Sequence, residues 1–284
     1  MASSKTAPAH RDTRGAARDA AVTAQYVDPD DADRYAASYE GSRPAARYYR
    51  SRLHVVDEAL RTAPHGRLLD VGCGPGMLVR RLLDLRPGEF EITACDQSPA
   101  MIDAATAQAK GSADVQLSVA RIEEMPFPDK YFDVVVAMGV LEYADADDGL
   151  REIARVVKPG GLTVVTMLNP LSPYRLVEWC LYWPLLRVLG RVEALFGVQR
   201  HAAEVSGIRA IPLARLRRMM LKRGLAPTDA VHYDVTPLVP PLDRPVRRRW
   251  DRKWHEHPEK TVSRGAGRWL GTAYLVTARR LEDV

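Results

Sequence analysis

The sequence has few cysteines. Its 284 residues contain three, Cys73, Cys95 and Cys180, which lie far apart and form no C-x-x-C pair. An odd and scattered set argues against a disulfide framework and against a zinc site. We therefore expect a reducing, cytoplasmic location and no bound metal.

Long apolar runs are also missing. The most apolar region, Leu176 to Val198, is interrupted by charged residues and a proline: Glu178, Pro184, Arg187, Arg191 and Glu193. The N-terminus shows no apolar core of a signal peptide. We expect no membrane span, although this region could still contact a membrane surface.

The overall composition is that of a globular protein, with 46% hydrophobic and 27% charged residues. The formal charge of +5 is compatible with an acidic partner but does not require one. Residues 1–24 lack periodic apolar positions, which predicts a disordered tail. The remaining residues, 25–284, are long enough for one large domain.

The stretch from Leu68 to Leu85 combines a short apolar strand, a glycine-rich turn and a helix. Leu68 to Val71 reads as the strand, and Met77 to Leu85 has helical spacing. The turn between them has the sequence Gly72-Cys73-Gly74-Pro75-Gly76. Such a turn presents backbone N–H groups at a helix N-terminus to an anionic or strongly polar ligand.

The glycine spacing narrows the class of ligand. A dinucleotide site needs G-x-G-x-x-G, and a P-loop needs a following Lys-Ser/Thr, and both are missing here. The G-x-G-x-G spacing, with Asp70 two residues before the first glycine, instead resembles the first motif of class I S-adenosylmethionine (SAM)-dependent methyltransferases.

The rest of the chain alternates strands and helices. Further buried strands are predicted at Glu91–Cys95, Val115–Ala120, Tyr131–Met138 and Leu162–Leu168, the last preceded by a turn at Lys158–Gly161. Five strand-and-helix units with short connections predict a parallel sheet with right-handed crossovers. The resemblance implies that a helix at Leu213–Leu225 and strands at Thr228–Val235 and Thr272–Ala278 complete a doubly wound α/β fold. Its seven-stranded sheet would be mostly parallel, with the last strand antiparallel.

Asp96 ends the second strand, twenty residues after Gly76. A doubly wound nucleotide-binding sheet places its ribose-binding carboxylate there. The alternative is that Asp96 only caps the helix beginning near Pro99, but Ser98 can provide that cap.

The resemblance implies the other cofactor contacts. Gln97 and Met101 would line the adenine, and Asp70 and Met138 would lie near the methionine end. Tyr39 either closes over the cofactor or packs in the core. The full predicted SAM site is Tyr39, Asp70, Gly72, Cys73, Gly74, Gly76, Asp96, Gln97, Met101, Arg121, Ile122 and Met138.

Arg121 departs from the family pattern. It stands where the family commonly has an aspartate that accepts a hydrogen bond from the adenine amino group, and an arginine has no acceptor. The adenine contact must then come from backbone groups near Ile122 or from Glu123.

Two extra segments, about residues 169–211 and 237–271, interrupt the resemblance. The first is apolar and could form a helical cap, acting as a lid over a bulky acceptor, packing on the core or a second subunit in a homodimer, or contacting a membrane surface. The second interleaves basic residues with tryptophans at helical spacing: Arg247, Arg248, Arg249, Trp250, Arg252, Lys253 and Trp254. It could bind RNA or pack its tryptophans inward.

Methyl transfer needs positioning and exclusion of water rather than a dedicated nucleophile. A base would help a hydroxyl acceptor, and the candidates are Glu142, Tyr143, His201 and His232, each of which could equally be structural. We expect a SAM-dependent methyltransferase acting on a small, partly apolar metabolite, lipid-like or aromatic, with O-methylation ahead of C-methylation. The alternatives are an RNA methyltransferase and a SAM-binding protein that transfers no methyl group. Nucleic acid is disfavoured because Gly139–Tyr143 replaces the Asp-Pro-Pro-aromatic sequence of many nucleic-acid enzymes.

Overall fold

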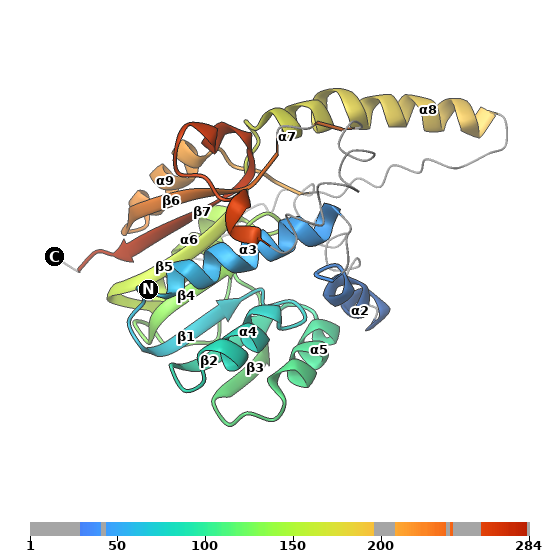
Figure 1. Ribbon diagram of the computed structural model, residues 1–284. Helices are drawn as coiled ribbons and strands as arrows, with labels where there is room; N and C mark the ends of the chain where they lie inside the picture. Colours follow the sequence, from blue (N-terminus) through green and yellow to red (C-terminus); the bar gives the residue numbers. More distant parts are fainter. Residues whose placement is uncertain (1–28, 41–43, 196–207, 237–238, 241–256, 283–284) are drawn as a thin grey trace, which may run out of the picture.

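The computed structural model describes residues 29–40, 44–195, 208–236, 239–240 and 257–282. At its centre lies a seven-stranded sheet with the order β3-β2-β1-β4-β5-β7-β6 (Figure 1). The strands are β1 (Gly66–Val71), β2 (Phe90–Asp96), β3 (Val115–Val119), β4 (Phe132–Met138), β5 (Val157–Leu168), β6 (Leu225–Val235) and β7 (Gly271–Arg280). Strands β1 to β5 pair in parallel, and β7 runs antiparallel to both of its neighbours. The predicted fold class is confirmed.

Helices cover both faces of this sheet. They are α2 (Pro29–Ala37), α3 (Pro44–Leu60), α4 (Met77–Leu85), α5 (Pro99–Ala109), α6 (Ala146–Val156) and α9 (Leu213–Lys222). Since side chains alternate along a strand, Leu68 of β1 packs into a core with α3, α4 and α5, while Leu69 packs into a second core with α6 and α9. Both faces are therefore apolar, which explains the nearly continuous hydrophobic run of β4.

The predicted turn at Lys158–Gly161 lies inside β5 rather than before it. Phe132 pairs with Val157, and Val134 then pairs with Leu162, so the intervening residues bulge out of the ladder. Gly160 has φ of 72°, a conformation that favours glycine. The turn chemistry was recognised correctly, but the strand resumes pairing on both sides of it.

The described part of the first extra segment is helical. It consists of α7 (Pro173–Val177), a π-helical turn η1 (Glu178–Tyr182) and α8 (Trp183–Leu195), and Figure 1 shows α8 extending away from the sheet. Trp179 packs against the core, whereas the large apolar side chains that follow are exposed: Leu181, Leu185, Val188 and Leu189. Packing of this whole segment on the core, one of the predicted alternatives, is therefore not observed for α8.

Of the second extra segment, two short 3-10 helices are described, η2 (Pro258–Thr261) and η3 (Ala266–Leu270). The predicted tail (residues 1–24), the basic and tryptophan-rich stretch 247–254 and His201 lie outside the described residues. Within the part of the chain that is described, no helix is long and apolar enough to cross a membrane.

Candidate active site

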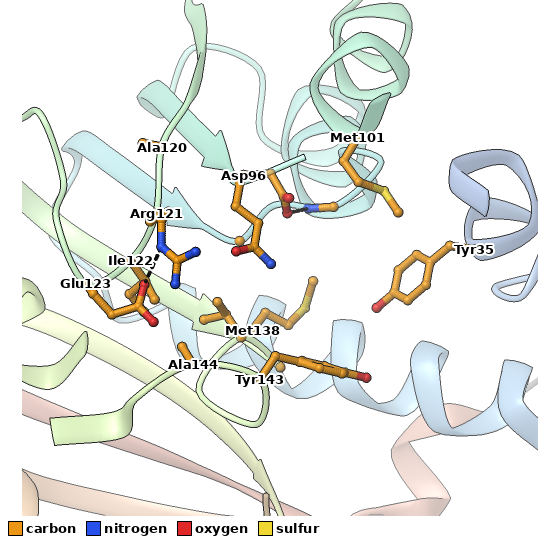
Figure 2. A pocket seen from close by; sticks show the side chains of 15 residues that line it. Tyr35, Asp96, Met101, Ala120, Arg121, Ile122, Glu123, Met138, Tyr143 and Ala144 are labelled. Atoms are coloured by element: carbon orange, nitrogen blue, oxygen red, sulfur yellow. Dashed lines mark hydrogen bonds and ion pairs between the residues drawn. The ribbon is translucent and has the colours of Figure 1, made fainter. Parts of the chain in front are cut away.

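A pocket opens at the carboxyl ends of β1, β2 and β4, where open α/β sheets bind their ligands. Figure 2 shows its side chains, with Tyr35 pointing from α2 toward Asp96 and Met138. The lining residues are Tyr35, Gly72, Gly74, Asp96, Gln97, Met101, Ala120, Arg121, Ile122, Glu123, Met138, Gly139, Val140, Tyr143 and Ala144. Eight predicted cofactor residues thus line one pocket: Gly72, Gly74, Asp96, Gln97, Met101, Arg121, Ile122 and Met138.

The glycines of the turn have different roles. Gly72 lines the pocket with φ of 65°, and a Cβ there would lie 2.6 Å from the Val140 side chain. Gly76 begins α4 with φ of 79° and is not part of the pocket lining, because it faces α5, where a Cβ would lie 2.9 Å from the Ala105 Cα. The Cys73 side chain is buried in the core, so only its backbone could reach a ligand.

Replacing Gly76 by alanine is expected to lower the free energy of unfolding by about 2–4 kcal/mol, because a left-handed alanine is strained and its methyl group meets the α5 backbone. Denaturant unfolding measures this loss. Gly88→Ala is the matched control, since Gly88 has φ of 76° but nothing within 4 Å of its Cβ position. Equal losses in the two variants would show that the contact with α5 contributes nothing.

Asp96 braces the turn from the end of β2. Its Oδ2 accepts from the Gly74 N–H at 3.0 Å, and its Oδ1 accepts from the Ser98 N–H at 2.9 Å. Burial raises the pKa of Asp96, and these N–H groups oppose the rise. The cap of α5 is Ser98, whose Oγ accepts from the Met101 N–H. Asp96 therefore lines the pocket without being needed as the helix cap.

Asp70 lies behind the turn, fully buried, and neither carboxylate oxygen has a hydrogen-bond partner among the described residues. Burial, with the nearby charge of Asp96, raises the pKa of Asp70 to about 7, and the charge of Arg52 opposes this. A buried carboxylate without a donor is costly, so the site fits a ligand that brings a cationic N–H group.

Arg52 of α3 was not predicted as a site residue. Its Nη2 donates to the hydroxyls of Tyr35 and Tyr39, each at 2.9 Å, and the side chain is buried. Its Nη1 lies only 2.2 Å from where a Cβ on Gly139 would stand, directly against the pocket lining. The charge of Arg52 acts on Asp70, so opposite charges lie close to one another behind the pocket lining, as suits a zwitterionic amino-acid group.

Of the two alternatives predicted for Tyr39, the structure shows packing in the core and not closure over the pocket. Tyr39 is buried, stacks on Tyr49 with ring centroids 4.9 Å apart, and does not line the pocket. Tyr35, one helical turn earlier, lines it, with its ring 3.7 Å from the Cβ position of Gly74. Tyr35 lies in α2 and Tyr39 in the turn that follows it, and Arg52 donates to both hydroxyls.

At the other end of the pocket, the segment after β3 forms one wall. Arg121 lines the pocket, and its Nε lies 3.5 Å from the Glu123 Oε2 in an ion pair. Ile122 and Glu123 line the same wall. The Glu123 carboxylate therefore lies at the pocket beside Arg121. It has the acceptor oxygens that an adenine amino group needs and that an arginine lacks.

Comparison with known proteins gives the family. A family model described as "Methyltransferase domain" matches residues 69–165. The demethylmenaquinone methyltransferase of Thermus thermophilus is 33% identical over 183 residues, 62% of this chain and 81% of that protein. The ubiquinone/menaquinone biosynthesis C-methyltransferase of Geotalea daltonii is 30% identical over 151 residues, 52% of this chain and 64% of that protein. The chain belongs to the SAM-dependent methyltransferases.

A solved structure supports the fold of this methyltransferase. The geranyl diphosphate C-methyltransferase of Streptomyces coelicolor A3(2), solved with S-adenosylhomocysteine, superposes with a TM-score of 0.52 at 19% identity. The match covers 84% of this chain and 81% of that one. SAM is the cofactor of the family, and the residues described above fit it: Asp96 for the ribose, and Asp70 with Arg52 for the amino-acid end.

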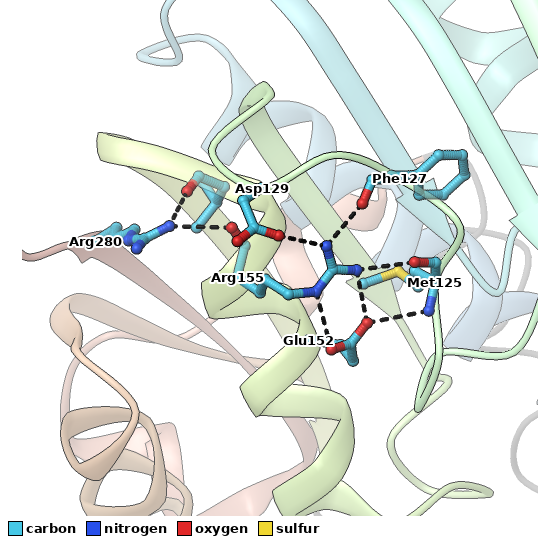
Figure 3. Close-up of polar contacts among 7 residues, drawn as sticks. Met125, Phe127, Asp129, Glu152, Arg155 and Arg280 are labelled. Carbon is cyan, nitrogen blue, oxygen red and sulfur yellow. Dashed lines mark hydrogen bonds and ion pairs between the residues drawn. The ribbon is translucent and has the colours of Figure 1, made fainter.

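The loop of residues 125–129, which follows the pocket wall, is fastened to α6 by Arg155 (Figure 3). The guanidinium donates to both oxygens of Glu152, to Asp129, and to the backbone carbonyls of Met125 and Phe127 at distances of 2.7–3.0 Å. This contact lowers the pKa of Glu152. The Arg155 side chain therefore positions the loop that follows the pocket wall of residues 120–123.

Replacing Arg155 by methionine is expected to lower the free energy of unfolding by about 2–4 kcal/mol, because Glu152 and two carbonyls lose their shared donor. Thermal unfolding measures the loss. Arg151→Met, one turn away on the exposed side of α6, is the control, and should change stability by less than about 0.5 kcal/mol. A loss in Arg155→Met no larger than in the control would contradict this role.

The predicted catalytic residues are not brought together. Tyr143 lines the pocket. Glu142 is buried just outside it, where Arg52 and Arg175 act on its charge. His232 lies on β6 beside Tyr274, at a ring distance of 5.8 Å, and its pKa is lowered by burial and by Arg268. It does not line the pocket and is not placed to serve as a base there.

Proposed function

We propose that the protein transfers the methyl group of SAM to a small, partly apolar acceptor, at a ring carbon in preference to an oxygen. The observation that supports this proposal is the pattern of charges in the pocket and directly behind its lining. Asp96 at one end suits a ribose diol, while Asp70 and Arg52 together suit an α-amino acid group. A nucleoside joined to an amino acid satisfies both ends.

The choice of carbon reverses the expectation from the sequence, which placed O-methylation first. The Geotalea daltonii relative is a ubiquinone/menaquinone biosynthesis C-methyltransferase. Because this chain spans 64% of that protein's length, the acceptor class remains a proposal for this chain. A quinone precursor is a ring compound with an apolar tail, which agrees with a small, lipid-like or aromatic acceptor.

When bound, SAM supplies an electrophilic methyl group on a sulfonium. The chain's own residues bind and orient the two reactants. Asp96 and the turn at Gly72–Gly74 hold the nucleoside end, and Arg52 with Asp70 holds the amino-acid end. Tyr35, Met138 and Val140 surround the pocket with aromatic and apolar surface, which excludes water from the transfer.

Calorimetric titration with SAM and S-adenosylhomocysteine, followed by an acceptor screen with isotope-labelled SAM methyl, tests the proposal. We expect micromolar binding of both ligands and label transfer to hydroxy-aromatic or quinol acceptors, with carbon and oxygen products distinguished by NMR. Absence of binding to either ligand would refute the proposal. Tight binding without transfer to any acceptor would favour a SAM-binding protein with another role.

A further inference from the structure

A row of buried charges continues from the cofactor pocket across the carboxyl edge of the sheet. Asp70 lies near the end of β1, Arg52 lies against Gly139 after β4, and Glu142 accepts a backbone hydrogen bond from Leu168 at the end of β5. The charge of Arg175 of α7, a partly buried side chain, also acts on Glu142. These charges lie beside the pocket, next to the lining residues Gly139, Val140 and Tyr143.

Glu142 is enclosed rather than solvated. Glu142 is 3% exposed, and Val140 and Tyr143 of the same loop line the pocket. Four elements besides its own loop bring titratable groups to it: Arg52 and Tyr48 from α3, Arg175 from α7, Tyr233 from β6 and Tyr274 from β7. A carboxylate between two guanidiniums and three phenols is a built polar site.

Arg175 is positioned by Glu178 and by the Tyr174 ring, 5.6 Å from its guanidinium carbon, and its Nε donor is left without a partner among the described residues. It forms an ion pair with Glu178 at 2.5 Å, which is part of the π-helical turn that follows α7. Its Nε is buried and has no hydrogen-bond partner among the described residues. π-Helical turns are frequent at functional sites, and a buried unsatisfied guanidinium donor calls for an acceptor group.

We propose that Glu142 takes the proton of an acceptor hydroxyl group and that Arg175 binds the oxyanion so formed. The acceptor is then recognised as an ionisable hydroxy-aromatic compound. This inference rests on the proposed methyl transfer and adds the groups that ready the acceptor for it.

Methyl transfer to the acceptor then needs the transfer of the hydroxyl proton and a displacement at the methyl carbon, with sulfur as the leaving group. The acceptor O–H bond breaks, its proton passes to the Glu142 carboxylate, and its electron pair stays on oxygen and spreads into the ring. The ring carbon or the oxygen then bonds the methyl group, while the methyl–sulfur bond breaks with its pair on sulfur. At carbon, the ring hydrogen leaves afterwards as a proton and the phenolate oxygen takes back the proton held by Glu142, so either product releases one proton overall.

The ionisation of Glu142 suits this role. Burial raises the pKa of Glu142 to about 7, against the opposing charges of Arg52 and Arg175 and the Leu168 hydrogen bond. Below that pH the group is protonated and cannot accept. Above it the carboxylate is the proton acceptor, and an anionic ligand placed beside it should draw a proton onto it.

The test uses 4-nitrocatechol, whose ionised form has its own absorption band, with protein saturated with S-adenosylhomocysteine. At about pH 8, calorimetry in two buffers of different ionisation heat measures proton exchange. We expect wild type to bind the ionised probe and take up about one proton, because Glu142 must be neutralised beside the anion. Glu142→Gln should bind the ionised probe without proton uptake. Arg175→Gln should weaken binding at least about tenfold.

The controls separate this inference from the proposed function. Glu91→Gln, an exposed carboxylate of β2, and Arg187→Gln, an exposed residue of α8, should both behave as wild type. S-Adenosylhomocysteine binding confirms that each variant is folded, and Glu142→Asp and Arg175→Lys serve where the first variants are not. With S-adenosylhomocysteine binding retained, any of three results would overturn this inference alone. They are no binding of the probe by wild type, no proton uptake by wild type when the probe binds, or full probe affinity in Arg175→Gln. Failure of the wild-type protein to bind S-adenosylhomocysteine would overturn the proposed function as well.

Discussion

Replacing Asp96 by asparagine is expected to lower the affinity for SAM and S-adenosylhomocysteine by at least about 100-fold, measured by calorimetric titration. Two hydrogen bonds to a charged carboxylate contribute roughly 1.5–3 kcal/mol each, and about 2.7 kcal/mol corresponds to 100-fold. The amide can accept at only one of its two positions, and it presents a donor at the other. Near-native affinity would overturn the placement of the ribose.

The fold should survive this change. Asp96 also accepts from Gly74 and Ser98, so some loosening of the turn is expected, but Ser98 still caps α5. Asp103→Asn, which replaces an exposed carboxylate on α5, is the matched control and should bind like wild type. A circular dichroism melt of both variants distinguishes loss of the ribose contact from loss of the fold.

Replacing Arg52 by glutamine is expected to weaken SAM binding by about 100-fold while leaving 5′-methylthioadenosine, which lacks the amino-acid group, unchanged within about twofold. The guanidinium lies against the pocket-lining Gly139 and next to Asp70, which would hold the ammonium. Competition binding with the two ligands measures the difference. Equal losses for both ligands would assign Arg52 a role in folding alone.

The same substitution should also cost stability. Arg52 is 3% exposed and bonds the hydroxyls of Tyr35 and Tyr39, and removal of one partner from a buried charged cluster costs about 3–5 kcal/mol. Arg61→Gln, at an exposed position just after the same helix, controls for the loss of a positive charge. Binding is therefore compared at a temperature where both variants are folded.

Local patterns predicted the parts of the site that are local in the chain. The glycine-rich turn and Asp96 belong to consecutive strand ends, so their spacing alone places them together at one edge of the sheet. The separate role of Gly76 did not follow from the pattern, because its contact is with Ala105 on another helix. Distance along the chain is what hides such a contact.

Arg52 could not be singled out from the sequence for the same reason. Helix α3 carries three arginines, Arg47, Arg50 and Arg52, all at positions that an exposed helix face also tolerates. Two of them, Arg47 and Arg52, are buried, the first on Asp234 and the second at the pocket. The sequence likewise does not show that Tyr35, in α2, lines the pocket while Tyr39, in the turn after α2, packs in the core.

Gly139 shows how an absent side chain can determine the charge of a site. A single Cβ at this position would occupy the place of the Arg52 guanidinium, although residue 139 itself carries no charge and makes no ion pair. Backbone sterics after β4 thus decide whether a cation from a helix distant in sequence can reach the ligand. In this chain, a larger residue at position 139 would have to displace the Arg52 guanidinium, and with it the cation proposed to bind the amino-acid end of the ligand.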